Sequence, residues 1–160
     1  MHHRTTLVVV AAIAALVAVA AASAGGVRVV ETAKNAKLGK TVLVTPSGRT
    51  LYTLSAERHG KFICVAQSCL SFWHPLVVAS GTTPTGVAGL ATIHRPDGRR
   101  QVTFRGGPLY TFAGDHRRGD AKGEGFKDVG VWHAASTAAA SSPPTTTGGG
   151  GGYGGGGGYH

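Results

Sequence analysis

The sequence predicts an all-β domain, a small antiparallel sandwich or barrel built from two related hairpin repeats and followed by a disordered C-terminal tail. Three observations support this prediction. About seven short strand-like runs are separated by turn residues at intervals of about 8–12 residues. No stretch has the apolar periodicity of a convincing amphipathic helix. Finally, the text of residues 44–57 recurs at residues 102–115.

The recurrence is the strongest of these signals. Residues 44–57 read V-T-P-S-G-R-T-L-Y-T-L-S-A-E, and residues 102–115 read V-T-F-R-G-G-P-L-Y-T-F-A-G-D. Aligned without a gap, the Val-Thr pair, the central glycine and Leu-Tyr-Thr are identical. Each copy leaves one strand, passes through a turn that contains glycine and enters a second strand. We therefore expect two related hairpins, each closed by an acidic residue, Glu57 or Asp115.

The predicted strands alternate with turns along the chain. Residues 41–45 are β-branched apart from Leu43, which suits a strand, and a Pro-Ser-Gly turn follows. In the next strand, alternation places Tyr52 and Leu54 on one face and Leu51 and Thr53 on the other. A second turn, Arg-Pro-Asp-Gly, begins at Arg95. The remaining strands are expected at residues 51–55, 76–79, 90–94, 99–104, 109–113 and 129–134, and residues 56–75 are expected to be irregular.

The predicted domain covers residues 41–134, with the two repeats at about 41–57 and 99–115. Residues 25–40 before it are polar and basic, so we expect a linker or a loose first strand there. From residue 135 the composition changes to Ala, Ser, Pro and Thr and then to glycine. A tail of this kind, residues 135–160, cannot bury enough apolar surface to offset its ordering entropy, and we expect it to be disordered.

The N-terminus has the features of an export signal. A short basic start precedes an apolar run of about 16 residues, and Ala22-Ser23-Ala24 supplies the small residues that signal peptidase recognises. We expect residues 1–24 to be a signal peptide cleaved after Ala24, and the protein to be secreted or associated with the cell envelope. A retained membrane anchor is the alternative, because the run lies near the lower length limit for spanning a bilayer.

The charge balance is strongly basic. The formal net charge is +9, with 16 lysines and arginines against 7 acids. Such a protein favours anionic surroundings, so the predicted partners are anionic cell-wall polymers or a membrane surface. Nucleic acid is not expected, because the cations are scattered along the chain and no nucleic-acid-binding motif is present.

Two cysteines, Cys64 and Cys69, lie close together in a chain that we expect to be exported. Such a pair predicts a disulfide, which would mainly fix local structure because it closes a short loop. The alternative is a redox-active dithiol, or a metal site formed with His59 and His74. However, the C-x4-C spacing is not the C-x-x-C of thiol oxidoreductases. The histidines also lack a metal-ligand spacing, so we predict no metal and no cofactor.

With these features in place, the chain resembles a bacterial family known as the secreted repeat of unknown function, whose signature is Y-x-[FWY]-x-x-D. The second copy matches this signature outright, and the first copy departs from it at two positions. We expect the acid of the second copy to cap a turn by accepting main-chain N–H bonds. The residues at the signature positions are Tyr110, Phe112 and Asp115 in the second copy and Tyr52, Leu54 and Glu57 in the first.

Other parts of the chain share this resemblance, which covers about residues 41–133. Asp120 lies in a G-D-x-x-G loop that matches the family. The two cysteines and Trp73 resemble the family's cysteine pair and the Trp-Pro-Pro-Leu run that follows it. The resemblance implies an extracytoplasmic repeat domain and supplies no established reaction. The signature residues are therefore expected to be structural or ligand-facing.

The leading functional prediction is an exported, envelope-associated and non-catalytic binding or structural module of unknown ligand. The alternative is an extracytoplasmic redox or metal-handling protein that uses the Cys64 and Cys69 loop with nearby histidines. No serine nucleophile motif and no zinc-hydrolase motif is present. We therefore predict no catalytic residue.

Overall fold

The computed structural model describes residues 25–58 and 60–138. The described chain is folded almost entirely into short strands, which confirms the predicted all-β class. Its sheets do not close into a barrel. One helix is present in this part of the chain, the single turn α1 (Gln67–Leu70), and no described helix is long and apolar enough to cross a membrane. The predicted signal peptide and most of the predicted tail lie outside the described residues.

The strands are short, and the longest have five residues. In chain order they are β1 (Val27–Arg28), β2 (Glu31–Asn35), β3 (Lys40–Val44), β4 (Leu51–Leu54), β5 (Trp73–Pro75), β6 (Val77–Val78), β7 (Pro84–Thr85), β8 (Leu90–His94), β9 (Arg100–Phe104), β10 (Gly107–Pro108), β11 (Tyr110–Phe112) and β12 (Trp132–Ala134).

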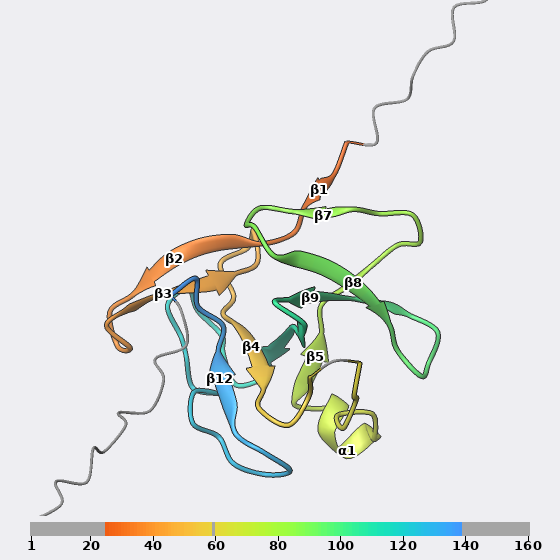
Figure 1. Ribbon diagram of the computed structural model, residues 1–160. Coiled ribbons are helices and arrows are strands. Elements are labelled where there is room, and N and C mark those ends of the chain that lie inside the picture. The colour runs from red at the N-terminus through yellow and green to blue at the C-terminus, as the bar shows by residue number, and fades with distance from the viewer. Residues whose placement is uncertain (1–24, 59, 139–160) are drawn as a thin grey trace, which may run out of the picture.

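Two four-stranded sheets make up most of the fold. One has the order β12-β4-β11-β5, and all its neighbouring strands are antiparallel. The other has the order β10-β9-β6, with β8 also paired to β9. Figure 1 shows the β2–β3 ladder on one side of the domain and β8 with β9 on the other, with β4, β5 and β12 below them. β1 runs parallel to β7.

The core consists of two clusters of buried side chains, and strand β4 contributes to both. Tyr52 and Leu54 lie in the first cluster, together with Trp73, Tyr110 and Trp132. Leu51 lies in the second cluster, together with Val30, Leu43, Val102 and Leu109. This division is the one that the alternation of strand residues predicts. The first core cluster is rich in aromatic side chains and contains the repeated tyrosines.

The fold has an internal two-fold arrangement that extends beyond the expected hairpins. β4 and β11 pair with Tyr52 directly opposite Tyr110. β5 pairs with the other edge of β11, and β12 pairs with the other edge of β4. We define the first unit as residues 31–76 and the second unit as residues 90–135. Each unit therefore ends in a strand that pairs with the central strand of the other, so the two units exchange their last strands.

Main-chain hydrogen bonds follow the same pattern in both halves. In each unit, the residue just after the exchanged strand forms main-chain hydrogen bonds with two residues of the opposite unit. Corresponding residues lie 58 or 59 positions apart in the sequence. The bonds are Leu43 N–H to Ala135 O and Ala135 N–H to Leu51 O in one half, and Val102 N–H to Leu76 O and Leu76 N–H to Leu109 O in the other, all at 2.8–2.9 Å.

The hairpins predicted from the repeated text form only in part. β3 and β4 share the single bridge between Val44 and Thr50. In the second copy, β9 pairs with β10 and not with β11. The reason is that a strand has only two hydrogen-bonding edges, and those of β4 are occupied by β11 and β12. The repeated text is therefore a corner at which the chain passes from one sheet to the next.

The domain extends beyond the predicted boundaries at both ends. Of the two expectations for residues 25–40, a linker or a first strand, the strand is present, because β2 lies in this segment and pairs along its whole length with β3. Val30, just before β2, is fully buried and anchors the segment in the second core cluster. At the other end, Ala135 is buried and Ser136 bridges to Val42. The segment predicted to be irregular, residues 56–75, contains α1 and β5.

Candidate functional site

The two repeated tyrosines donate hydrogen bonds from one unit to the other. The Tyr52 hydroxyl of the first unit donates to Asp115 Oδ2 of the second unit at 2.7 Å. The Tyr110 hydroxyl of the second unit donates to Glu57 Oε2 of the first unit at 2.8 Å. All four side chains are buried. The repeated signature therefore builds two equivalent tyrosine–carboxylate pairs, each shared between the units.

Each of these carboxylates also organises the loop that follows it. Asp115 Oδ1 accepts the main-chain N–H of Lys122, seven residues later, at 2.9 Å. Glu57 Oε1 accepts the N–H of Cys64, also seven residues later, at 2.7 Å, and that of Ile63 at 2.6 Å. A buried polar group costs free energy unless it is hydrogen-bonded. These bonds therefore hold both loops against the core.

The hydroxyls of both tyrosines are held in their protonated form. Burial, the hydrogen bond to Asp115 and the charge of Asp115 raise the pKa of Tyr52 above its ordinary value. Burial and the charge of Glu57 likewise raise the pKa of Tyr110, although the nearby guanidinium of Arg95 partly opposes this. Each tyrosine is thus a fixed hydrogen-bond donor. The four signature residues are engaged in holding the two units together.

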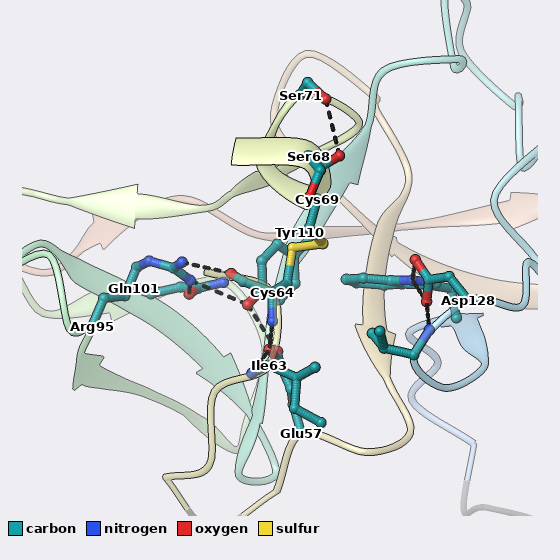
Figure 2. The surroundings of a disulfide bond; sticks show 12 residues. Glu57, Ile63, Cys64, Ser68, Cys69, Ser71, Arg95, Gln101, Tyr110 and Asp128 are labelled. Carbon is teal, nitrogen blue, oxygen red and sulfur yellow. Dashed lines mark hydrogen bonds between the residues drawn. A yellow bond between two sulfur atoms is a disulfide. The ribbon is translucent and has the colours of Figure 1, made fainter. Parts of the chain in front are cut away.

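A buried arginine connects the Tyr110 pair to the disulfide loop, as Figure 2 shows. Arg95 is only 3% exposed. Its guanidinium donates to the Tyr110 hydroxyl oxygen at 3.1 Å, to the Cys64 carbonyl oxygen at 2.8 Å, and to the side-chain oxygen of Gln101. Its Nε donates to Asp97 at 3.2 Å. The charge is tolerated in the core because every guanidinium nitrogen has a partner.

The predicted disulfide between Cys64 and Cys69 is present, with the two Cα atoms 5.4 Å apart. Cys64 is fully buried in the first core cluster. Its main-chain N–H is bonded to Glu57 and its carbonyl to Arg95. Cys69 belongs to α1. The disulfide therefore attaches the short helix to a loop that Glu57 and Arg95 already hold by hydrogen bonds to the main chain of Cys64 (Figure 2).

The third signature position packs against a tryptophan in both units. Leu54 lies directly opposite Trp132 in the β4–β12 ladder, and Phe112 lies directly opposite Trp73 in the β11–β5 ladder. The ring centroids of Phe112 and Trp73 are 4.5 Å apart. The repeated tyrosines meet these tryptophans edge-on, with centroids at 5.4 Å for Tyr52 and Trp73. An apolar residue suits this position because its cross-strand neighbour is a buried aromatic ring.

Asp120 is partly buried in the loop between Asp115 and Lys122 that Asp115 organises. Its carboxylate accepts the main-chain N–H groups of His116 at 3.0 Å and Arg117 at 3.1 Å. Lys37 and Lys122 lie within 3.7 Å and 3.6 Å of it. These hydrogen bonds and charges lower the pKa of Asp120 from 3.8 to about 2. Asp120 therefore caps its own loop.

The alternative metal site was considered with two histidines, His59 and His74. His74 is exposed on β5, and His59 lies outside the described residues. Within the part of the chain that the structure describes, no three His, Cys, Asp or Glu side chains are grouped so that they could hold a metal ion. The two cysteines are bonded to each other.

A surface groove brings together basic and hydroxyl side chains that are far apart in the sequence. Its volume is about 350 Å³. Thr53 of β4 and His133 of β12 lie directly opposite each other in their ladder and both line the groove. Side chains directly opposite in a ladder lie on the same face of the sheet. The basic and hydroxyl residues of the lining are Lys40, Arg58, Arg105, His133, Thr53, Ser55 and Ser136.

The second unit matches a known protein family. Residues 91–136 match the model of a family described as a secreted repeat of unknown function. This finding confirms the family resemblance for the second unit, whereas the first copy and the cysteine loop lie outside the match. It also supports an exported protein. The matched span is shifted by one residue from the second unit, which was defined from the strand exchange as residues 90–135. The matched span includes most of β8, before the repeated text, and the exchanged strand β12 after it. No curated protein and no solved structure matches the chain.

Several residues that complete the secreted repeat were missed by the sequence analysis. Trp132 and His133 repeat Trp73 and His74 at a spacing of 59, whereas the signature repeats at a spacing of 58. An ungapped comparison therefore does not align them, and allowing one inserted residue would have found the second pair. Nothing in the sequence marks the burial of Arg95, which lies in a turn-forming stretch.

Proposed function

We propose that the protein is an exported, non-catalytic binding module that attaches to anionic cell-wall polymers through its basic surface. The observation that carries this proposal is the distribution of exposed charge. Among the described residues, eleven lysines and arginines are exposed, but only two acids are, Asp97 and Asp128. Exposed cations therefore outnumber exposed acids by more than five to one, whereas in the whole sequence 16 lysines and arginines stand against 7 acids.

The imbalance follows from how the acids are used inside the fold. Glu57 and Asp115 are buried and bonded to tyrosines of the opposite unit. Asp120 and Glu124 are partly buried and form ion pairs with lysines. Negative charge is thus withdrawn from the surface while most cations stay exposed. A surface of this kind attracts polyanions and repels cationic partners.

The N-terminal segment supports the part of the proposal that concerns export. The apolar run and the small residues Ala22-Ser23-Ala24 support cleavage after Ala24. The family description of a secreted repeat supports the same compartment. Because the signature residues are engaged in joining the two units, the binding surface is expected among the exposed cations and not at the tyrosines.

The test is a sedimentation assay with the purified secreted protein and isolated cell walls. We expect retention at low salt and release at about 1 M salt, where the Debye length is only about 3 Å. Walls from which the anionic polymers have been extracted should retain little protein. Retention that is unaffected by salt or by the extraction would contradict the proposal. Binding to anionic lipid vesicles but not to walls would assign the basic surface to a membrane instead.

A further inference from the structure

We propose that the groove beside β12 and the β9–β10 turn is a binding site for a phosphate-type oxoanion. This inference rests on the proposed function and narrows it, because it names the anionic group and the place where it binds. The groove has a volume of about 350 Å³ and contains three permanent cations, Lys40, Arg58 and Arg105. Pockets of this size bind small ligands or single segments of larger ones.

The backbone of Arg105 is the first observation that points to a ligand. In the described chain, Arg105 is the only non-glycine residue with a positive φ, at 48°. It forms a two-residue turn with Gly106, whose φ is 78°, between Phe104 and Gly107. Turns of this type favour asparagine followed by glycine, because a residue with a Cβ is strained in this conformation. Strain of this kind is concentrated at functional sites.

The side chain of Arg105 is also held in place. Its guanidinium lies over the Phe104 ring, 4.9 Å from the centroid. It donates to the carbonyl oxygens of Thr137 at 3.0 Å and Ala138 at 3.3 Å. A guanidinium has five N–H donors, so these two bonds fix its position and leave donors for a ligand. The side chain remains exposed.

The charge of the groove fits a phosphate group better than a single carboxylate. Glu124 lies 3.4 Å from Lys40 and 3.0 Å from His133, and it also accepts the Ala134 N–H. Its one negative charge offsets one of the three permanent cations and leaves two. A phosphate monoester carries up to two negative charges, and so do two consecutive phosphodiesters. Guanidinium groups match the geometry of such oxoanions.

Hydroxyl groups complete the lining. Thr53 and Ser55 lie in the same groove as the cations, and so does Ser136, whose hydroxyl already donates to the Thr41 carbonyl oxygen. Neutral hydroxyl donors beside cations are the usual complement of a phosphate site, because they bind oxygen atoms without adding charge. The groove therefore provides planar donors from two arginines, whose charges Glu124 does not offset, and short hydroxyl donors from Thr53 and Ser55.

The test combines three soluble probes with two charge-matched variants. The probes are inorganic phosphate, a glycerol-phosphate polymer and polygalacturonate, which carries only carboxylates. The groove variant is Arg58→Gln with Arg105→Gly, and the control variant is Arg117→Gln with Lys127→Gln, two exposed cations outside the groove. Binding is followed by the shifts of the Thr53 and His133 amide resonances and by retention on isolated walls.

We expect the phosphate probes to shift both amides, with the polymer binding more tightly. The groove variant should weaken this binding about tenfold or more, which corresponds to the loss of charge-assisted hydrogen bonds. The control variant should weaken it less than about threefold, as expected for screened surface charges. Arg105→Gly alone should weaken binding without lowering the unfolding temperature, since glycine accepts the positive φ.

The possible failures of the two proposals differ. If both variants lose wall retention equally and no groove amide shifts, the groove proposal is wrong and the proposed function stands. If polygalacturonate shifts the groove amides as strongly as the phosphate polymer does, the site is not specific for phosphate and the groove proposal is wrong. If the phosphate polymer binds in the groove but isolated walls retain nothing, the groove proposal stands and the proposed function fails. Groove binding only with anionic lipid vesicles would assign the phosphate to a headgroup, with the same consequence.

Discussion

Trp73 and Trp132 stack face to face, with ring centroids 3.7 Å apart and an angle of 6° between the ring planes. Both are fully or almost fully buried, and they come from the two exchanged strands, β5 and β12. Each tryptophan is thus carried into the opposite unit and meets its counterpart there. Because each buried ring packs on a ring of the opposite unit, the stack makes the stability of each unit depend on the other.

Tyr52→Phe and Tyr110→Phe should destabilise the protein by similar amounts, about 1.5–3 kcal/mol each. Each change removes a hydrogen bond to a buried carboxylate and keeps the aromatic ring in place. The free energy of unfolding in urea measures both effects. Markedly unequal costs would contradict the equivalence of the two pairs.

Asp115→Ala should cost at least about 2 kcal/mol of stability, because it leaves the Tyr52 hydroxyl and the Lys122 N–H without their acceptor. Asp115→Asn should cost less, since the amide oxygen can still accept one of the two bonds. Glu31→Gln is the matched control, because the Glu31 side chain has no hydrogen bond to any described residue. An unchanged unfolding temperature in Asp115→Ala would show that the carboxylate does not hold its loop.

Reduction of the Cys64–Cys69 bond should lower stability by about 2 kcal/mol, the chain-entropy value for so short a loop. The loss should be local, because Glu57 and Arg95 still hold the main chain at Cys64. Thermal unfolding with and without reductant gives the comparison. The double variant Cys64→Ala with Cys69→Ala should not respond to reductant. A response of equal size in that variant would mean that reductant acts elsewhere.

Stability should fall as the pH drops from about 4 toward 2. The pKa of Asp120 is lowered from 3.8 to about 2 in the folded protein. A group with a depressed pKa stabilises the fold fully above its unfolded pKa, and this contribution is lost as the pH falls through the folded value. Hydrogen bonds from Arg99, and further bonds from Arg95, lower the pKa of Asp97 and act in the same direction.

Asp120→Asn tests this assignment. In that variant the slope of unfolding temperature against pH between about 4 and 2 should be shallower, because one group no longer takes up a proton on unfolding. The two proteins should differ least at the acidic end of the range. A slope that is the same in both proteins would remove Asp120 from the account of acid sensitivity.

The strand pattern and the signature of the second repeat could be predicted from the sequence because they depend on local chemistry. Turn residues and β-branched runs located β3, β4, β9 and β11 nearly to the residue. Alternation also placed Tyr52 and Leu51 on opposite faces. What alternation cannot supply is the partner on each edge of a strand, because any neighbour satisfies the same hydrogen bonds. The strand exchange was therefore not predicted.

The candidate site, like the fold, could be predicted from the sequence only in part. The tyrosines and acids of the signature were found, but the sequence could not show that Tyr52 bonds to Asp115 and not to Glu57 of its own unit. Arg95 was interpreted as part of a turn, and its burial depends on acceptors from three other segments, supplied by Cys64, Gln101 and Tyr110. The groove was missed because Lys40 and Arg105 meet only after the sheets are assembled.

The exchanged strands have a consequence for how such a domain can specialise. Two separate copies of one unit, assembled in this way, would display every surface feature twice. Joining the copies in one chain removes that constraint, so a residue can change on one side alone. Arg105 has Ser47 as its counterpart in the first copy. The shared interior can thus stay symmetric while one flank acquires a ligand preference that the other lacks.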